Sequence, residues 1–228
     1  MMVPPTNDMV GMATARANVY GLLADIFRDE PSDSLLSKLR EPVFSGALHA
    51  LSLSLDEMFE KTSNAQLVED LALEFTRLFI GPGSHISANE SMHVEARFGE
   101  PNAYWGPQTV EVKKFMEAAG LQVADTFGGM PDHISAEFEF MQQLLLKEGE
   151  EWADGKRELA LNILHIEMQF YDEHLSQWIS NFCGKVIGAS EHPFYAQFAE
   201  VTKGFIEFEK ETLQDLINDV EQSDRLSA

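Results

Sequence analysis

Apolar residues recur at every third or fourth position along almost the whole chain, and this helical period is the strongest constraint on its fold. The clearest example is the stretch Gly128–Lys147, where two glycines and a Pro-Asp pair precede a helix that we expect to start at His133. The apolar face of this helix consists of Ile134, Phe138, Phe140, Met141, Leu144 and Leu145. His133 and Glu137 lie on that same face, one turn apart, where packing alone would favour Leu or Ala. This pair is the first indication of a site.

The same period predicts a chain of about eight or more helices with short joins. The expected spans are Asp8–Arg28, Asp33–Arg40, Val43–Lys61, Ala65–Ile80, Gln108–Ala119, a helix from His133 that Asp154-Gly155 separates from the next, Lys156–Phe182 and Pro193–Val220. No strand-like alternation of useful length, internal repeat or Pro-, Gly- or Ser-rich linker interrupts them. The sequence therefore predicts an all-α fold, a single helical-bundle-like domain over residues 1–228, with frayed tails at about 1–8 and 221–228.

Particular residues mark the expected ends of these helices. Ser32 and Asp33 can cap the helix that starts at Asp33, Ser63-Asn64 opens a later one, and Asp132 is the N-cap expected for the helix at His133. Gly81-Pro82-Gly83 ends one helix, and Gly184–Gly188 is expected to break another. Between Ser84 and Pro107 the sequence has no period, which gives a loop of about 25 residues. Because loops of this length are uncommon in compact domains, a functional role is expected there.

Net charge narrows the class of partner. The 228 residues include 16 basic and 38 acidic side chains, for a formal charge of −22. This charge argues against binding to nucleic acid or to an anionic membrane. It suits a basic partner such as an arginine-bearing peptide, although solubility alone would also explain it. No apolar run approaches the roughly 20 residues of a membrane span, and the N-terminus lacks the pattern of a secretory signal. We therefore expect a cytoplasmic protein without membrane insertion.

The sequence offers no convincing catalytic or cofactor site. Cys183 is the only cysteine and has no patterned His or Asn around it, so a buried structural thiol is favoured over a nucleophile. The nucleotide-binding and hydrolase motifs GxGxxG, GxxxxGK[ST] and GxSxG are absent. A di-iron site needs two Glu-x-x-His motifs, whereas the chain has one, Glu90-Ser-Met-His93. His165 and His174 are about 180° apart around their helix and cannot share a metal. We predict no enzyme activity, cofactor or metal; a carboxylate-bridged metal protein is the least favoured alternative.

A binding groove is the alternative that survives. The segments Glu74–Ser84 and Pro131–Leu145 each join an apolar helix to a Gly/Pro corner and place charged residues beside aromatics. The charged residues are Glu74, Arg77, Glu90, Asp132 and Glu137, and the apolar ones are Phe75, Phe79, Pro82, Phe138 and Phe140. Such a groove would suit a peptide with an apolar stretch and a cationic end. Core packing of the aromatics, capping by Asp132 and hydrogen bonding of His133 and Glu137 inside the core remain open as alternatives.

Three sequence blocks resemble those of a known family. They are Glu74-Phe-Thr-Arg-Leu-Phe-Ile-Gly-Pro-Gly83, Glu90-Ser-Met-His93 and Pro131-Asp-His-Ile-Ser-Ala-Glu-Phe-Glu-Phe-Met141. Their order and spacing resemble the TorD/DmsD family of cytoplasmic chaperones dedicated to molybdoenzymes, and the resemblance extends from about Ala13 to Phe208. The family usually has Pro-Tyr before the Glu-Ser pair and Val-Tyr after it. Here Ala88-Asn89 and Met92-His93 occupy those places, and the segment from Glu95 to Trp105 is also atypical.

The resemblance implies a specific role. A chaperone of this family binds the twin-arginine signal peptide, or the apoenzyme, of a DMSO-reductase-type molybdoenzyme and delays export until the cofactor is inserted. The client-binding positions that the resemblance implies are Asp132, His133, Phe79, Pro82, Glu90, Ser91 and Glu137. The alternative within the family is an assembly chaperone for a cytoplasmic nitrate-reductase-type subunit without a leader. The resemblance implies either a monomer or a domain-swapped dimer, and the guanine-nucleotide binding attributed to some members has no motif here.

Overall fold

The computed structural model describes residues 6–41, 55–94, 104–121 and 128–227. Within them every named element is helical: α1 (Thr6–Arg28), α2 (Asp33–Leu39), α4 (Asp56–Lys61), α5 (Asn64–Phe75), η1 (Thr76–Ile80), η2 (Glu90–Met92), α6 (Pro107–Ala118), α7 (Ile134–Ala153), α8 (Arg157–Phe170), η3 (Tyr171–Leu175), α9 (Ser176–Ala189) and α10 (Pro193–Ser227). The elements η1 and η3 are π-helical turns, and η2 is a 3₁₀ turn. The predicted all-α class is confirmed.

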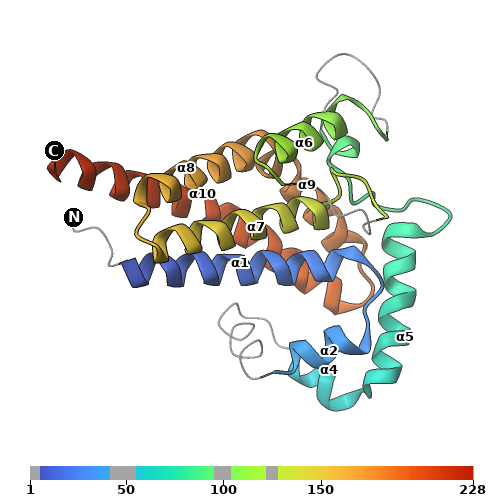
Figure 1. Cartoon of the computed structure of the whole chain (residues 1–228). Coiled ribbons are helices and arrows are strands. Elements are labelled where there is room, and N and C mark those ends of the chain that lie inside the picture. The colour runs from blue at the N-terminus through green and yellow to red at the C-terminus, as the bar shows by residue number, and fades with distance from the viewer. Residues whose placement is uncertain (1–5, 42–54, 95–103, 122–127, 228) are drawn as a thin grey trace.

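The long helices α1, α7, α8, α9 and α10 pack together (Figure 1). Helices α2, α4 and α5 form a smaller group near the C-terminal end of α1. The most extensive packing is between α1 and α7, which run antiparallel, because the last residue of α1 lies near the start of α7 and the middle of α1 near its end. A Cβ at Gly21 would overlap the end of the Gln142 side chain, which would have to turn away. No helix among these residues is both long and apolar enough to cross a membrane.

A group of charged side chains lies buried where α1, α7, α8 and α10 meet. Arg16 donates to Glu167 at 2.7 Å and to Glu209 at 2.6 Å, and its other terminal nitrogen lies 3.5 Å from Glu148. We call these four residues the bundle cluster. One guanidinium faces three carboxylates, and burial raises the pKa of Glu148 and Glu167 above the ordinary value.

The predicted helix boundaries were accurate where local capping determines them. The Ser32 hydroxyl accepts from the Leu35 amide at 3.2 Å, and the Ser63 hydroxyl accepts from the Gln66 amide at 3.3 Å. Of the helix expected over Val43–Lys61, residues 43–54 lie outside the described residues. Helix α10 continues beyond Val220 to Ser227. That the chain forms a single domain and that its tails are frayed remain predictions.

Two predicted boundaries were wrong. The expected break at Gly184–Gly188 does not occur, because α9 continues to Ala189 and buries Cys183 and Val186 on its apolar side. A glycine costs only about 1 kcal/mol inside a helix, which this burial offsets. Asp132 is not the N-cap of α7 either. His133 has that position, and its Nδ1 accepts from the Ser135 amide at 3.3 Å.

Candidate functional site

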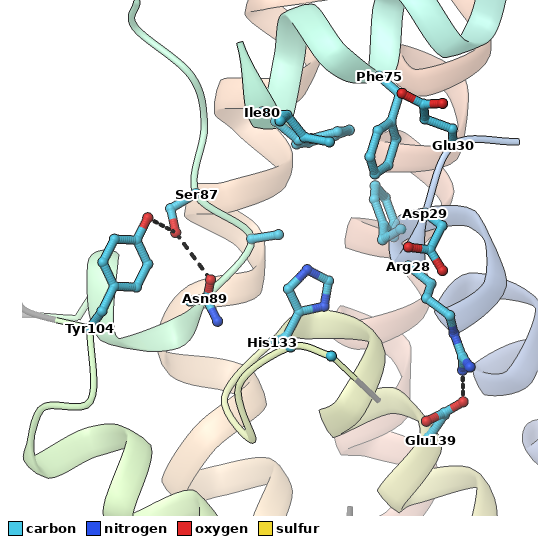
Figure 2. Close-up of a pocket in the computed structure, with 15 residues that line it drawn as sticks. Arg28, Asp29, Glu30, Phe75, Ile80, Ser87, Asn89, Tyr104, His133 and Glu139 are labelled. Carbon is cyan, nitrogen blue, oxygen red and sulfur yellow. Dashed lines mark hydrogen bonds and ion pairs between the residues drawn. The ribbon is translucent and has the colours of Figure 1, made fainter. Parts of the chain in front are cut away.

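A cavity of about 940 Å³ opens where the C-terminal end of α1, the turn η1 and the start of α7 meet. Figure 2 shows His133 in the middle of this cavity, with Tyr104 on one side and Arg28, Asp29 and Glu139 on the other. Phe27, Phe75 and Phe79 form its apolar wall. The cavity therefore combines an aromatic surface with a charged edge, and it is large enough for several side chains of a peptide.

The aromatic wall is made by one residue each from α1, α5 and the π-helical turn η1. The wider hydrogen bond of this turn runs from the Gly81 amide to the Thr76 carbonyl at 2.6 Å, and Gly81 then takes an extended conformation that ends the helix. The ring of Phe79 lies 5.0 Å from that of Phe75 and 6.3 Å from that of Phe27. Because Phe79 is only partly buried by these neighbours, it offers an apolar surface to the cavity.

The edge beside α1 is negatively charged. Arg28 forms an ion pair with Glu139, while Asp29 and Glu30 follow at the exposed end of the helix. The Glu30 carboxylate accepts a hydrogen bond from the Thr76 hydroxyl at 3.0 Å, which directs it toward η1. Arg28 is one cation beside the carboxylates of Asp29, Glu30 and Glu139, so this edge keeps a net negative charge. We call Asp29 and Glu30 the acidic rim.

His133 is uncharged at neutral pH. Burial is the main cause that lowers the pKa of its imidazole to about 4, against the opposing effect of nearby Asp132 and Asp29. Its Nδ1 lies 2.8 Å from the Ser135 hydroxyl, which fixes the ring at the start of α7. A neutral imidazole beside the acidic rim can contact a ligand cation without repelling it.

The floor of the cavity is a short contact between two segments that are distant in the sequence. The Glu90 amide donates to the Asp132 carbonyl at 2.9 Å, and the Ile134 amide donates to the Ala88 carbonyl at 2.8 Å. The Asp132 carboxylate accepts from the Ser91 amide at 3.1 Å. Asp132 thus ties the segment 88–91 to the start of α7, which explains why it does not cap that helix.

Beneath this floor lie buried acidic residues. The Glu90 carboxylate lies 2.9 Å from Nδ1 of His174, which the π-helical turn η3 brings inward. The Glu137 carboxylate accepts from the indole N–H of Trp178 at 3.0 Å. Burial, together with the neighbouring charge of Glu90, raises the pKa of Glu137 well above its ordinary value. We call Glu90, Asp132, Glu137 and His174 the cavity-floor network.

The structure separates the predicted site residues into three groups. His133 and Phe79 line the cavity. Asp132, Glu90, Ser91 and Glu137 lie beneath it, each at most 2% exposed. Pro82 instead lines a second hollow of about 800 Å³, on the other side of Glu30.

Other members of the predicted groove have different roles. Glu74 and Arg77 form a two-bond ion pair, and the Glu74 carboxylate also accepts from the Glu191 and His192 amides at 2.7 and 3.1 Å. Phe138 and Phe140 belong to the core. The His133 side chain contacts Ser135 and the Glu137 side chain contacts Trp178, while the Glu137 amide donates to the His133 carbonyl.

The acidic rim and Tyr104 were not predicted as site residues. Asp29 and Glu30 precede a proline, and in the sequence they indicated only the end of a helix. Two acidic residues at the C-terminal end of a helix interact unfavourably with the helix dipole. This unfavourable placement was a usable signal of a binding role.

The residues considered for catalysis and metal binding have other surroundings in the described part of the chain. Burial raises the pKa of the Cys183 thiol to about 12, so the thiol is inert at neutral pH. No group of three or more His, Cys, Asp or Glu within those residues is arranged to hold a metal ion. Of the histidines considered for iron, His174 contacts Glu90.

Comparison with known proteins gives a consistent result. Residues 41–184 match the family model described as nitrate reductase delta subunit. The chaperone protein TorD of Shewanella piezotolerans is 23% identical over 217 residues, which cover 87% of this chain and 92% of that protein. The TorD proteins of Shewanella loihica and Vibrio cholerae are 24% and 20% identical, and cover 93% and 90% of this chain and 99% and 94% of their own lengths.

Proposed function

Because the chain belongs to the nitrate reductase delta subunit family, which includes the TorD-type chaperones, we propose that it is a cytoplasmic chaperone for the precursor of a molybdoenzyme. The chaperone binds the twin-arginine leader peptide of that precursor and holds it until the cofactor is inserted. It acts by binding, and it catalyses no reaction.

The observation that carries this proposal is the combination of an acidic rim with an aromatic wall in one cavity. A leader peptide has paired arginines followed by an apolar segment of roughly 7–15 residues. Guanidinium groups pair well with carboxylates such as those of Asp29 and Glu30, and the apolar segment finds Phe75 and Phe79 on the adjacent wall. The charge of −22 adds long-range attraction for a cationic peptide.

In this proposal the predicted site residues divide into contacts and supports. His133 and Phe79 touch the peptide, and Pro82 contacts the flanking residues of the client from the second hollow. Asp132, Glu90, Ser91 and Glu137 are buried, so they act by holding the floor segment and His133 in position.

A synthetic peptide with two adjacent arginines and about ten following apolar residues tests the proposal. Its binding is measured by fluorescence anisotropy with wild-type protein and with the double variant Asp29→Asn/Glu30→Gln. We expect the variant to bind at least about tenfold more weakly, because it lacks the two carboxylates that pair with the arginines.

The double variant Glu211→Gln/Asp215→Asn is the matched control, since it removes the same charge from exposed positions on α10. It should retain nearly full affinity at moderate salt. Equal losses in the two double variants would mean that net charge alone attracts the peptide, and would contradict the proposed cavity.

One observation favours a second candidate function. The description of the matching family model names the delta subunit of nitrate reductase. The client of this chaperone can therefore be a catalytic subunit that has no leader peptide. Co-purification of the client precursor with and without its N-terminal segment distinguishes the two. Retention of the shortened client at full yield would favour the assembly role.

A further inference from the structure

Two consecutive exposed aromatic residues lie opposite the acidic rim, and the first of them, Tyr104, lines the cavity. Tyr104 and Trp105 are 47% and 63% exposed, and they immediately precede the corner that starts α6. Tyr104 lines the cavity, and its hydroxyl lies 3.4 Å from the Ser87 hydroxyl. Figure 2 shows Tyr104 across the cavity from Asp29, with His133 between them. We call Tyr104 and Trp105 the aromatic edge.

The backbone of Trp105 is strained. Its φ is 60°, and among the described residues it is the only non-glycine with a positive φ. Bulky residues avoid this region, and glycine would adopt it without cost. Because the indole is exposed, burial in the core does not compensate the strain. Strain that persists in an exposed aromatic residue next to the cavity-lining Tyr104 points to a role in binding.

The cavity carries apolar surface in two places: Phe75 and Phe79 lie beside the acidic rim, and Tyr104 lies across His133 from it. The acidic rim is at the α1 side, and the aromatic edge is at the α6 side. Exposed Tyr and Trp are the side chains that most often anchor a partner, because they bury a large area with few rotatable bonds. A peptide that carries arginines at one end and leucines at the other matches this arrangement.

We propose that Trp105, together with Tyr104, binds the apolar segment of the same client peptide whose arginines lie at the acidic rim. The peptide then crosses the cavity over His133 from α1 toward α6, and the aromatic edge selects clients by the apolarity of that segment. This inference rests on the proposed function and assigns the direction of the bound peptide.

The chain provides its own probe. Its three tryptophans are Trp105, Trp152 and Trp178, and the last two are 4% and 1% exposed. Quenching of tryptophan fluorescence by acrylamide therefore reports mainly on Trp105. An arginine-pair peptide with a leucine segment should protect Trp105 and shift its emission to shorter wavelength. A peptide with the same arginines and a serine segment should do neither.

A substitution at Trp105 can test its contact with the peptide without lowering the stability of the protein. Trp105→Gly suits the observed φ, so its thermal unfolding midpoint should not fall below that of the wild type. It should weaken binding of the leucine peptide about tenfold and leave that of the serine peptide unchanged. Phe208→Ala is the matched control, because Phe208 is an aromatic residue of similar exposure on α10, and it should bind both peptides like the wild type.

The possible outcomes are distinct. If the wild type binds neither peptide, the proposed function fails and this inference fails with it. If the wild type binds the arginine peptides but Trp105→Gly binds the leucine peptide equally well, only this inference is overturned. Protection of Trp105 that depends on protein concentration without any peptide would show that a second copy covers the aromatic edge, and would also overturn it.

Discussion

The bundle cluster and the cavity-floor network are both buried and rich in carboxylates, but they differ in their partners. In the bundle cluster the Arg16 guanidinium reaches three glutamates on three other helices. In the cavity-floor network no Arg or Lys is bonded to the carboxylates within the described residues, which instead accept from a backbone amide, an indole and an imidazole.

This difference indicates two functions for buried charge. The bundle cluster joins long helices away from the cavity, so its removal should affect stability and leave recognition unchanged in the folded protein. The cavity-floor network joins the segment 88–91 to the start of α7 directly beneath His133. Changes there should alter both stability and peptide affinity. Each of the following variants tests one side of this comparison.

Arg16→Met should have the largest effect. It leaves three buried carboxylates without their cation, and removal of one partner of a buried ionic group costs about 3–5 kcal/mol. Urea unfolding at pH 7 measures the change in the free energy of unfolding. Lys113→Met is the control, since Lys113 is exposed and forms only a surface pair with Glu117. A loss below about 1 kcal/mol for Arg16→Met would contradict the assigned role.

Asp132→Asn should have an intermediate effect on stability and a clear effect on binding. The substitution weakens the hydrogen bond from the Ser91 amide, which should cost about 1–3 kcal/mol. Affinity for the arginine-pair peptide should also fall, because this bond helps hold the floor beneath His133. Calorimetric titration and urea unfolding measure the two quantities. Asp215→Asn, an exposed change on α10, should alter neither, and normal affinity in Asp132→Asn would show that the floor does not contribute to binding.

Glu137→Gln should change the pH dependence of stability. The pKa of Glu137 is raised in the folded state, so its contribution is fully present below the unfolded pKa and is lost as pH rises through the folded value. Glutamine mimics the protonated acid and removes this loss. The stability of the wild type relative to Glu137→Gln should therefore decline above about pH 5, by at most about 1.4 kcal/mol per pH unit. Parallel profiles would contradict a buried, protonated Glu137.

His133→Asn should show the smallest effect near neutral pH, and with the opposite sign. The pKa of His133 is lowered to about 4, so the unfolded chain binds a proton before the folded chain does. Stability should fall as pH drops from about 6.5 toward 4 in the wild type, and less so in the variant. Between pH 7 and 6 the difference should remain below about 1 kcal/mol. Unfolding profiles over pH 4–8 would contradict this if the variant lost stability more steeply than the wild type.

The sequence predicted the helices well because their signals are local. Apolar spacing and the caps Ser32 and Ser63 act within one or two turns, and the structure follows them. Gly184 and Gly188 were misread as a break, because burial of Cys183 and Val186 against other helices outweighs a local preference.

The site was less accessible to sequence reasoning because its contacts are not local. Asp132 accepts from Ser91, which is 41 residues away, and Glu90 reaches His174 across 84 residues. The blocks around Phe79 and Asp132 lie at or beneath the cavity, but no pattern showed that Asp132 would be buried while Asp29 would be exposed. Burial is decided by the whole arrangement of helices.

Photo-crosslinking is the most direct test of the account. An arginine-pair peptide with a photoreactive residue beside the arginines is irradiated with the wild-type protein, and the labelled residues are identified by mass spectrometry. The account predicts labels at the end of α1 and on η1, close to Asp29, Glu30 and Phe79. Labels confined to α8 or α10, away from the cavity, would contradict it.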